Sequence, residues 1–373
     1  MFPQYQYSRK VVIATNSSCN LKCTYCYEKE KESTNTSFNV DEVFSSLKNL
    51  LRTKSEYGTK IKLLGGESFL VFDKLSQLCE RLWNDKDIVD YFHVHVTTNG
   101  TLIHGRIQEW LYKNRDKITL KLSLDGAKKS QDINRPNSFD KIDIPFFVKT
   151  WPDICVNMTI SPQTLPYAVD NIQFLHSCGI KYIISQFSLM SDWKLCSVSD
   201  FYHQVMKIVD FYLCNPQLEP WYFFNSNIAL TLISSNACAA CISGKTKAYD
   251  FITKKYYPCH LFFPSVAGKK TTKELSKIDF ANADNLVSSE CQDCPFINLC
   301  TTCYVDNYIS RGAISKRNLS MCKYQKAIFV GQFHFEYARI LAKEEPTEED
   351  FLKMKTIQQM ANIINDLEEQ IIA

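Results

Sequence analysis

The chain has 373 residues, of which 45% are hydrophobic and 13% aromatic, so its composition excludes an intrinsically disordered protein. Its 43 basic and 40 acidic residues give a net charge of +3, which indicates no general attraction to nucleic acid or to a membrane surface. The length suits two compact domains, or one large domain with an appendage. Because no run of about 18 apolar residues and no signal peptide is found, we expect a cytoplasmic protein without a transmembrane helix.

Six short runs rich in apolar and β-branched residues alternate with stretches whose apolar residues recur at helical spacing. The expected strands are 11–15, 61–64, 92–97, 120–124, 154–160 and 182–187. The expected helices are 40–51, 72–83, 107–113, 142–148, 168–176 and 201–213. This alternation predicts a parallel sheet with right-handed crossovers. Because six units fall short of the eight of a complete barrel, we expect an α/β fold with a partial (β/α)6 TIM-like barrel.

Three cysteines, Cys19, Cys23 and Cys26, follow the first expected strand with the spacing C-x3-C-x2-C. A four-iron cluster ordinarily takes four thiolates, so three thiolates would leave one iron open to bind a small molecule. A zinc site usually has two paired C-x2-C halves, and no fourth ligand is obvious nearby. The spacing therefore favours an iron–sulfur cluster with an open iron over a zinc site.

Three further polar runs each follow the carboxyl end of an expected strand. They are Gly65-Gly66-Glu67, the stretch 97–101 with Asn99, and the stretch 123–126. In a barrel of this kind the loops after the strands build the site. Glycines allow close approach of the backbone to a ligand, and a carboxylate can accept a hydrogen bond from an ammonium group. We expect these loops and the cysteine loop to form one ligand pocket.

The last third of the chain contains a second group of cysteines. Its members are Cys238, Cys241, Cys259, Cys291, Cys294, Cys300, Cys303 and Cys322. Strand-like sequence at 248–252 and 256–257 predicts a hairpin that returns Cys259 toward Cys241. The spacing C-x2-C-x5-C-x2-C is a strong metal signal, and a reducing compartment favours metal ligation over disulfides. Zinc would accept these ligands, but their number favours two further iron–sulfur clusters.

Residues 327–373 show the pattern of a helical extension that is interrupted by the acidic stretch 344–350. Thr347 and Asp350 have the spacing of a capping box at the start of the second helix. We therefore expect three parts, namely a barrel over 1–230, a small cysteine-rich domain over 231–326 and a helical extension over 327–373.

The first cysteine motif with Tyr25, the run Gly65-Gly66-Glu67 and the run 123–126 resemble the radical S-adenosylmethionine (SAM) enzymes, over most of residues 8–230. The resemblance implies that the open iron chelates the amino and carboxylate groups of SAM. It implies that Glu67 receives the amino group, and that Tyr25 lies beside the adenine. The residues that it assigns to SAM binding are Tyr25, Gly65, Gly66, Glu67, Asn99, Ser123 and Arg135.

The second group of cysteines resembles the SPASM domain, the cluster-binding extension of radical enzymes that modify peptides and proteins. The expected cofactors are therefore SAM and three 4Fe-4S clusters, of which two are auxiliary. By this resemblance, one auxiliary cluster is held by Cys291, Cys294, Cys300 and Cys322, and the other by Cys259, Cys303, Cys241 and Cys238. The chain departs from the usual pattern because it lacks a hairpin glycine near Lys254.

The two resemblances together imply an oxidoreductase that matures a ribosomally made peptide. A 5′-deoxyadenosyl radical would abstract a side-chain hydrogen, and a carbon–carbon or thioether crosslink would form. The implied partners are a precursor peptide and an electron donor such as flavodoxin or ferredoxin. Because only 18 residues precede Cys19, we expect no leader-binding domain there, and a separate leader-peptide-binding protein could take that role.

Two other functions stay open on the sequence alone. Anaerobic sulfatase-maturing enzymes carry an aspartate base directly after the cysteine that matches Cys259, and this chain has His260 at that position. Histidine could also accept a proton near neutral pH, so His260 is a candidate base and formylglycine formation is the first alternative. The second alternative is a non-catalytic protein that binds zinc or iron–sulfur clusters.

Overall fold

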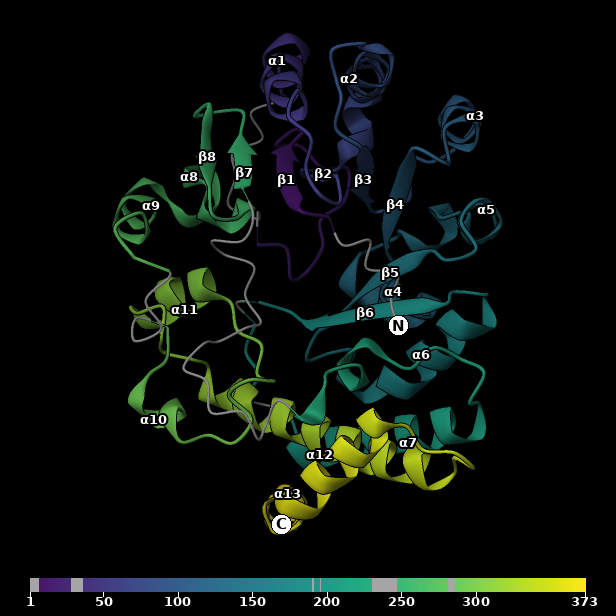
Figure 1. The fold of residues 1–373 in the computed structure, drawn as a ribbon, viewed down its shortest axis with the longest axis vertical. Coiled ribbons are helices and arrows are strands. Elements are labelled where there is room, and N and C mark those ends of the chain that lie inside the picture. The colour runs from purple at the N-terminus through teal and green to yellow at the C-terminus, as the bar shows by residue number, and fades with distance from the viewer. Residues whose placement is uncertain (1–6, 28–35, 190, 195, 230–246, 281–285) are drawn as a thin grey trace. The chain divides into compact units, whose positions relative to one another are not determined.

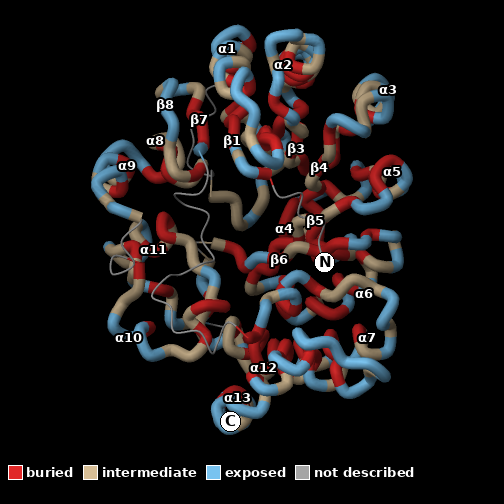
Figure 2. Tube along the Cα trace, viewed as in Figure 1, coloured by how far each residue is buried: buried red, intermediate tan, exposed pale blue. Residues whose placement is uncertain are grey.

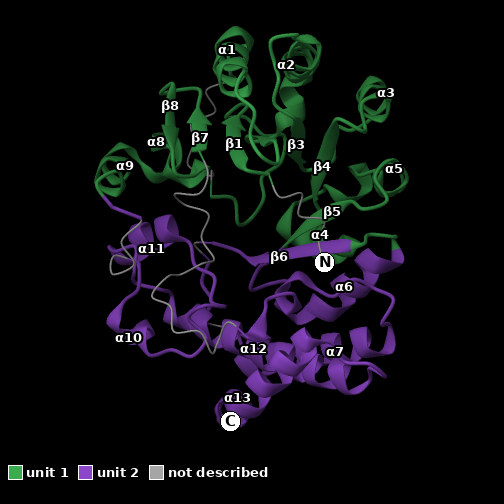
Figure 3. Ribbon diagram, in the orientation of Figure 1, with its two compact units in different colours: residues 1–158, 178–181, 242–277 green, residues 159–177, 182–241, 278–373 purple. Residues whose placement is uncertain are grey.

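A computed structural model describes residues 7–27, 36–189, 191–194, 196–229, 247–280 and 286–373 of the chain (Figure 1). Contacts divide the chain into two compact units (Figure 3). The first unit consists of residues 1–158, 178–181 and 242–277, and the second of residues 159–177, 182–241 and 278–373. None of the described helices is both long enough and apolar enough to cross a membrane.

The first unit is built on a sheet with the strand order β5-β4-β3-β2-β1-β7-β8. Its strands are β1 (Arg9–Ala14), β2 (Thr59–Leu64), β3 (Phe92–Thr98), β4 (Ile118–Ser123), β5 (Cys155–Ile160), β7 (Lys247–Asp250) and β8 (Lys255–Tyr257). Neighbouring strands from β5 to β7 pair in parallel, and β8 pairs antiparallel with β7. The predicted parallel sheet is confirmed.

Helices follow the strands of the first unit. They are α1 (Val40–Leu51), η1 (Ser68–Val71), α2 (Phe72–Asn84), α3 (Arg106–Lys113), α4 (Lys128–Asn134), η2 (Phe139–Lys141), α5 (Ile144–Thr150), η6 (His260–Phe262), α8 (Pro264–Ala267) and α9 (Lys269–Leu275). Helices α1, α2, α3 and α5 lie outside the sheet (Figure 1), and each has buried residues, such as Leu47 in α1 (Figure 2). Helix α4 was not predicted, because its buried residues Ser130, Gln131 and Asn134 are polar and give no apolar periodicity.

Strands β7 and β8 form the hairpin that the sequence predicts. Lys254 adopts a φ of +56° at its turn, the left-handed conformation that the missing glycine would otherwise supply. Strand β7 pairs with β1, with Val11 opposite Lys247 and Ile13 opposite Tyr249. The hairpin therefore extends the main sheet, although we expected it in a separate cysteine-rich domain. The predicted domain boundaries themselves stay predictions.

The second unit is mainly helical. Its elements are η3 (Leu165–Tyr167), α6 (Ala168–Ser177), β6 (Tyr182–Phe187), α7 (Val198–Cys214), η4 (Tyr222–Phe224), α10 (Ser289–Gln292), α11 (Tyr304–Arg311), α12 (Leu319–Leu341) and α13 (Glu348–Ile372). Helices α7 and α12 pack along each other, and α13 packs against both. Gly331 of α12 allows this approach, because a Cβ at that position would lie 2.3 Å from a methyl carbon of Val205.

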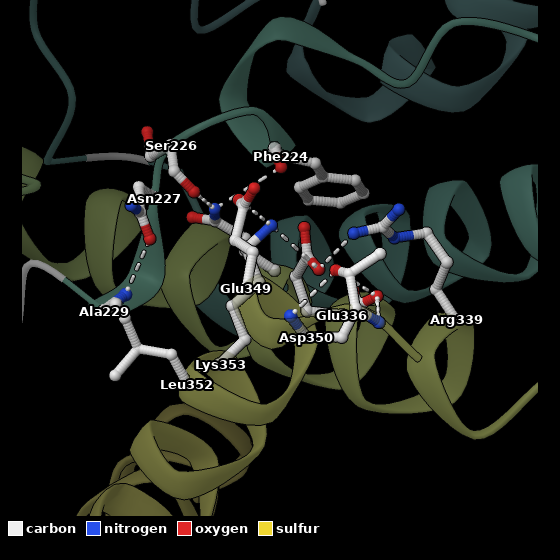
Figure 4. Close-up of polar contacts among 12 residues, drawn as sticks. Phe224, Ser226, Asn227, Ala229, Glu336, Arg339, Glu349, Asp350, Leu352 and Lys353 are labelled. Carbon is white, nitrogen blue, oxygen red and sulfur yellow. Dashed lines mark hydrogen bonds and ion pairs between the residues drawn. The ribbon is translucent and has the colours of Figure 1, made fainter. Parts of the chain in front are cut away.

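Buried polar contacts hold α13 to α12 (Figure 4). The predicted capping box is present, since the Thr347 hydroxyl accepts from the N–H of Asp350 and the Asp350 carboxylate accepts from the N–H of Thr347. The ammonium group of Lys353 lies 3.6 Å from the carboxylate of Glu336, which also pairs with Arg339 at 2.6 Å. Each buried charge in this contact therefore has a partner of opposite sign.

Candidate functional site

The loops that follow β1, β2, β3 and β4 meet at one edge of the sheet, because parallel strands all point the same way. The loop after β1 contains the three cysteines of the first motif. The next three loops contain Glu67, Asn99 and Asp125. Hydrogen bonds among these loops show how closely they approach.

Backbone contacts join the start of the cysteine loop to the loop after β2. The N–H of Gly66 donates to the carbonyl of Asn16 at 3.2 Å, and the N–H of Glu67 donates to the carbonyl of Ser18 at 2.9 Å. A Cβ on Gly66 would lie 2.2 Å from the Ser18 oxygen, and a Cβ on Gly65 would lie 2.4 Å from Asn16 Oδ1. Both glycines are therefore required by the approach of one loop to the other, a reason that the sequence analysis did not give.

The side chain of Glu67 is buried and accepts three hydrogen bonds. Its Oε1 accepts from the N–H of Phe69 (3.0 Å) and the hydroxyl of Thr98 (2.9 Å), and its Oε2 accepts from the N–H of Asn99 (2.7 Å). Burial raises the pKa of Glu67, and these hydrogen bonds oppose that rise. A carboxylate offers about four acceptor positions, so Glu67 can accept one more donor, such as the ammonium group that the resemblance assigns to it.

Asn99 connects the loop after β3 to the cysteine loop. Its Nδ2 donates to Asn20 Oδ1 at 2.9 Å and lies 3.9 Å from the sulfur of Cys19. Its Oδ1 accepts from the N–H and the hydroxyl of Thr101, and Asn20 donates to that same hydroxyl at 2.8 Å. This closed set of hydrogen bonds directs an amide donor toward one of the predicted cluster ligands.

Asp125, in the loop after β4, is the centre of a second set of contacts. Its Oδ2 accepts from the Tyr25 hydroxyl (2.6 Å), Arg135 Nε (2.9 Å) and Asn134 Nδ2 (3.2 Å). Arg135 Nη1 lies 3.8 Å from the sulfur of Cys23, and the guanidinium carbon lies 5.3 Å from the centre of the Tyr25 ring. Tyr25 and Arg135, both predicted from the sequence, are thus brought together.

The sequence analysis missed Asp125 as the connecting residue. Its position in the run 123–126, next to the predicted Ser123, is the one signal that could have found it. Asp125 and Arg135 form an almost fully buried ion pair, and Ser123 is buried at the end of β4. Burial raises the pKa of Tyr25, so its hydroxyl stays protonated and donates to Asp125.

The thiols of the cysteine loop are close enough to influence one another. Burial raises the pKa of Cys19 to about 11, and the negative charges of Glu67, Cys23 and Cys26 add to this rise. Burial also raises the pKa of Cys23, while the nearby Arg135 opposes the rise. Metal binding requires thiolates, so a cluster that binds here would displace the protons of these thiols.

The residues around the loop fit a 4Fe-4S cluster with three protein thiolates. Asn99 and Arg135 direct N–H groups toward two of the sulfurs, as outer-shell donors do in iron–sulfur sites. In the part of the chain that the structure describes, no three Cys, His, Asp or Glu side chains are placed to hold a single metal ion. Zinc would draw its thiolates to about 2.3 Å, whereas a cluster distributes them over separate irons. The N–H groups that are directed toward two separate sulfurs therefore fit a cluster at this loop.

His260 lies beside the cysteine loop. The centre of its ring is 5.7 Å from the centre of the Tyr27 ring, and the two rings are tilted by 52°. His260 begins η6, directly after the buried Cys259, and it lines a hollow together with Asn16 and Gly65. The candidate base from the sequence is thus close to the predicted SAM-binding loops.

Three cysteines of the second group lie in one neighbourhood of the second unit. Cys291 belongs to α10, Cys294 follows it, and Cys322 lies in the first turn of α12. Burial raises the pKa of Cys322, and the like charges of Cys294 and Cys291 contribute to the rise while Lys326 opposes it. These three thiols were predicted to share one auxiliary cluster, and that assignment stays a prediction.

The remaining cysteines of the second group are only partly described. The sulfur of Cys303 accepts from the N–H of Asp306 at 3.5 Å and so begins α11. The N–H of Cys300 donates to the carbonyl of Phe296 at 2.9 Å. Predicted ligands outside the described residues are Cys238 and Cys241. The division of these cysteines between two auxiliary clusters stays a prediction.

The chain is similar to several known proteins. Residues 13–144 match the Radical SAM superfamily. Over 327 residues, the chain is 26% identical to the cysteine-type anaerobic sulfatase-maturating enzyme of Clostridium perfringens. This alignment covers 76% of this chain and 85% of that enzyme.

Two solved structures share the fold. The structure of anSMEcpe with bound AdoMet and the Cp18Cys peptide has a TM-score of 0.68 and 17% identity, over 94% of this chain and 99% of that one. The structure of Streptococcus suis SuiB bound to its precursor peptide SuiA has a TM-score of 0.58 and 18% identity, over 84% of this chain and 76% of that one.

The cysteine loop at the carboxyl edge of a parallel sheet, within the matched region, defines residues 13–144 as a radical SAM domain. The chain is therefore an enzyme with a radical SAM domain over residues 13–144, and it shares the fold of anSMEcpe and SuiB. The predicted fold class is confirmed.

Proposed function

We propose that this enzyme matures a ribosomally made peptide by abstracting a hydrogen atom from one side chain and joining that side chain to a second one. The observation that carries the proposal is the meeting of the cysteine loop with the loops of Glu67, Asn99 and Asp125 at one edge of the sheet. Support for a peptide substrate comes from the two solved structures above, both of which contain bound peptides.

The proposed cofactors are SAM and three 4Fe-4S clusters. Bound to Cys19, Cys23 and Cys26, a cluster supplies the electron that converts SAM to methionine and a 5′-deoxyadenosyl radical. Glu67 would accept a hydrogen bond from the amino group of SAM, and Ser123 and Arg135 would orient its carboxylate and ribose. The buried walls of this site would exclude water and align the substrate hydrogen with the radical carbon.

Crosslinking balances as a two-electron oxidation of the peptide. One hydrogen atom leaves a side-chain carbon for the 5′ carbon of deoxyadenosine, and the peptide radical then bonds to a carbon or sulfur of a second side chain. That second atom loses a proton, and the product loses one electron. We assign the electron to the auxiliary clusters on the second group of cysteines, and His260 is the candidate acceptor of the proton.

The proposed partners are the precursor peptide, an electron donor such as flavodoxin or ferredoxin, and a separate leader-peptide-binding protein. The test begins with anaerobic reconstitution, followed by counting of iron and detection of 5′-deoxyadenosine after reduction with SAM. About twelve irons per chain are expected for three clusters. Bound zinc, together with no deoxyadenosine, would show that the chain is a non-catalytic metal protein.

Formylglycine formation is a second candidate, favoured by the 26% identity to the sulfatase-maturating enzyme. In that case His260 would replace the aspartate that acts as base in those enzymes, and no crosslink would form. Incubation with a cysteine-containing sulfatase peptide, followed by aldehyde trapping and mass spectrometry, separates the two candidates. An aldehyde product supports formylglycine formation, whereas loss of two hydrogens without an aldehyde supports a crosslink.

A further inference from the structure

On strands β2 to β4, the sheet of the first unit has one apolar face and one face that carries lysines, whereas β1 continues the second face with the apolar residues Val12 and Ala14. On β2, Ile61 and Leu63 are buried, whereas the alternating residues Lys60 and Lys62 are half-buried. Because successive side chains of a strand point to opposite faces, the two lysines share the face that the apolar residues do not use. Figure 1 shows helices α1 and α2 outside the sheet, so the lysines lie on its inner face.

Strand register extends this face from β2 across β3 and β4 to β5. Lys60 pairs with His93 and Lys62 pairs with His95 between β2 and β3. Between β3 and β4, Thr97 is opposite Lys121. The inner-face residues are Lys60, Lys62, His93, His95, Thr97, Thr119, Lys121 and Cys155. We call these residues the basic inner face.

The lysines of the basic inner face repel one another, and the described residues give them no acidic partner. Burial, followed by repulsion from Lys121 and Lys60, lowers the pKa of Lys62 to about 7. Burial and the same kind of repulsion lower the pKa of Lys60 to about 8. The groups that favour their charged forms are the thiols of Cys155 and Cys259. Among the described residues, no carboxylate forms an ion pair with any of the three lysines.

Two polar atoms on the same face also lack a partner. His95 Nε2 and the hydroxyl of Thr97 are buried, and within the described part of the chain neither makes a hydrogen bond. A buried polar atom without a partner has a cost that a ligand can remove. Unpaired lysines and unpaired polar atoms are therefore two independent signs of a missing ligand that is negatively charged and accepts hydrogen bonds.

Two lysines of the basic inner face lie close to the strand ends that carry the candidate site. Lys62 stands two residues before the end of β2, and Lys121 stands two residues before Ser123 at the end of β4. Tyr7 is buried at the opposite end, with its ring centre 6.0 Å from that of His95. A ligand would therefore approach the lysines from the edge where the cysteine loop lies.

We propose that the basic inner face binds a carboxylate of the substrate peptide, from an aspartate or glutamate close to the side chain that is modified. This inference rests on the proposed peptide substrate. Three lysines at the end of a strand-lined site would supply point charges to a carboxylate. The face offers no arginine fork and no helix N-terminus, the features that favour phosphate. The carboxylate of SAM has its own predicted partners, Ser123 and Arg135.

The test measures protection of the lysines against acetylation, in the reconstituted enzyme with SAM present and no reductant. Each lysine is followed by mass spectrometry during brief treatment with isotopically labelled acetic anhydride at pH 7.5. The probes are N-acetylglutamate N-methylamide, the neutral N-acetylglutamine N-methylamide, and inorganic phosphate. The exposed Lys86 and Lys113 serve as internal references.

The glutamate probe should slow acetylation of Lys62 and Lys121 by about fivefold at a concentration of about four times its Kd. The glutamine probe should leave both rates unchanged, and Lys86 should react equally in every case. Equal protection by the two amino-acid probes, stronger protection by phosphate, or no reaction of Lys62 with the small anhydride would each overturn the proposal.

Substitution of Lys62 provides a second measurement on a folded enzyme. In Lys62→Met, protection of Lys121 by the glutamate probe should fall below about twofold, whereas Lys62→Arg and the exposed control Lys86→Met should retain it. Circular dichroism and iron content verify that each variant is folded and loaded. Because the assay needs no turnover, a failure of the glutamate probe to protect Lys121 in the unchanged enzyme would overturn the carboxylate site alone. Failure of the proposed function would instead appear as no product from any peptide.

Discussion

The two groups of cysteines are positioned in different ways. The loop of Cys19, Cys23 and Cys26 contains no helix or strand, and side chains of neighbouring loops, such as Asn99 and Arg135, reach its sulfurs. In the second group, by contrast, Cys291 lies in α10, Cys303 directly precedes α11 and Cys322 lies in α12. The loop that we propose to leave one iron open is thus held by the loops that we propose to bind SAM.

Because the two groups of cysteines are positioned differently, loss of a cysteine is expected to have different consequences in each group. These consequences are the largest of the predicted effects. In Cys23→Ala, formation of 5′-deoxyadenosine should fall to the level without enzyme, because two thiolates cannot hold the SAM-binding cluster. In Cys294→Ala, SAM cleavage should remain while peptide product is lost. Liquid chromatography and mass spectrometry of both products, with iron counts, check this result. Complete loss of SAM cleavage in Cys294→Ala would contradict the separation of the two groups.

The second largest effect is expected at Asp125, which holds residues beside the cysteine loop but is not a predicted cluster ligand. Asp125→Asn keeps the size of the side chain but leaves the buried Arg135 without its ion-pair partner. Arg135 and Tyr25 then lose their fixed positions, and SAM cleavage should fall by about 10- to 100-fold, as for other outer-shell changes.

The measurement for Asp125→Asn is the kcat and KM of SAM cleavage at full iron loading. The matched control is Asp153→Asn, which removes an exposed ion pair with Lys181 in the same unit. The control should behave like the unchanged enzyme. An equal loss in both variants would mean that the Asp125 network acts on stability and not on the cysteine loop.

Local sequence patterns predicted most of the first unit and the positions of the loops, because parallel strands place their carboxyl ends at a common edge. The six strands were found from β-branched runs, and the cysteine loop from its spacing. Helix α4 was missed because its buried face is polar, and the pairing of β7 with β1 was missed because no local pattern encodes contacts between distant segments.

Within the site, residue types were easier to predict than contacts. Glu67, Asn99 and Arg135 were predicted, but the central role of Asp125 depends on three partners from separate segments. The basic inner face was missed because only residues 61–64 of β2 were taken as a strand. The alternation of lysine and apolar residues from position 60 would have revealed a polar inner face.

Buried lysines also differ between the two units. Lys62 of the first unit has no acidic partner in the described part of the chain, whereas Lys353 of the second unit lies 3.0 Å from Glu349 and 3.6 Å from Glu336. The pKa of Lys62 is lowered from 10.5 to about 7, so the unfolded chain binds a proton more tightly than the folded one. Folding stability is therefore lost as the pH falls from 10.5 toward 7.

We expect Lys62→Met to stabilise the enzyme by on the order of 3 kcal/mol at pH 7, with the gain disappearing near pH 10.5. Lys353→Met should destabilise it, because Glu336 loses one of its two cationic partners. Denaturant unfolding of both variants at pH 7 and pH 10 checks these signs. Destabilisation by Lys62→Met at pH 7 would show that Lys62 has a partner in solution.

The smallest effect is expected at helix caps that lie away from both groups of cysteines. Asn39 caps α1 in the first unit, and Thr347 caps α13 in the second. Replacement of either residue by alanine should cost about 1 kcal/mol and lower the Tm by about 2 °C. Thr347→Ser, which keeps the hydroxyl, should restore the value of the unchanged enzyme. SAM cleavage should be the same in Asn39→Ala and Thr347→Ala, because neither cap contacts a cysteine, and a loss in one of them would show that its helix positions the nearest cluster.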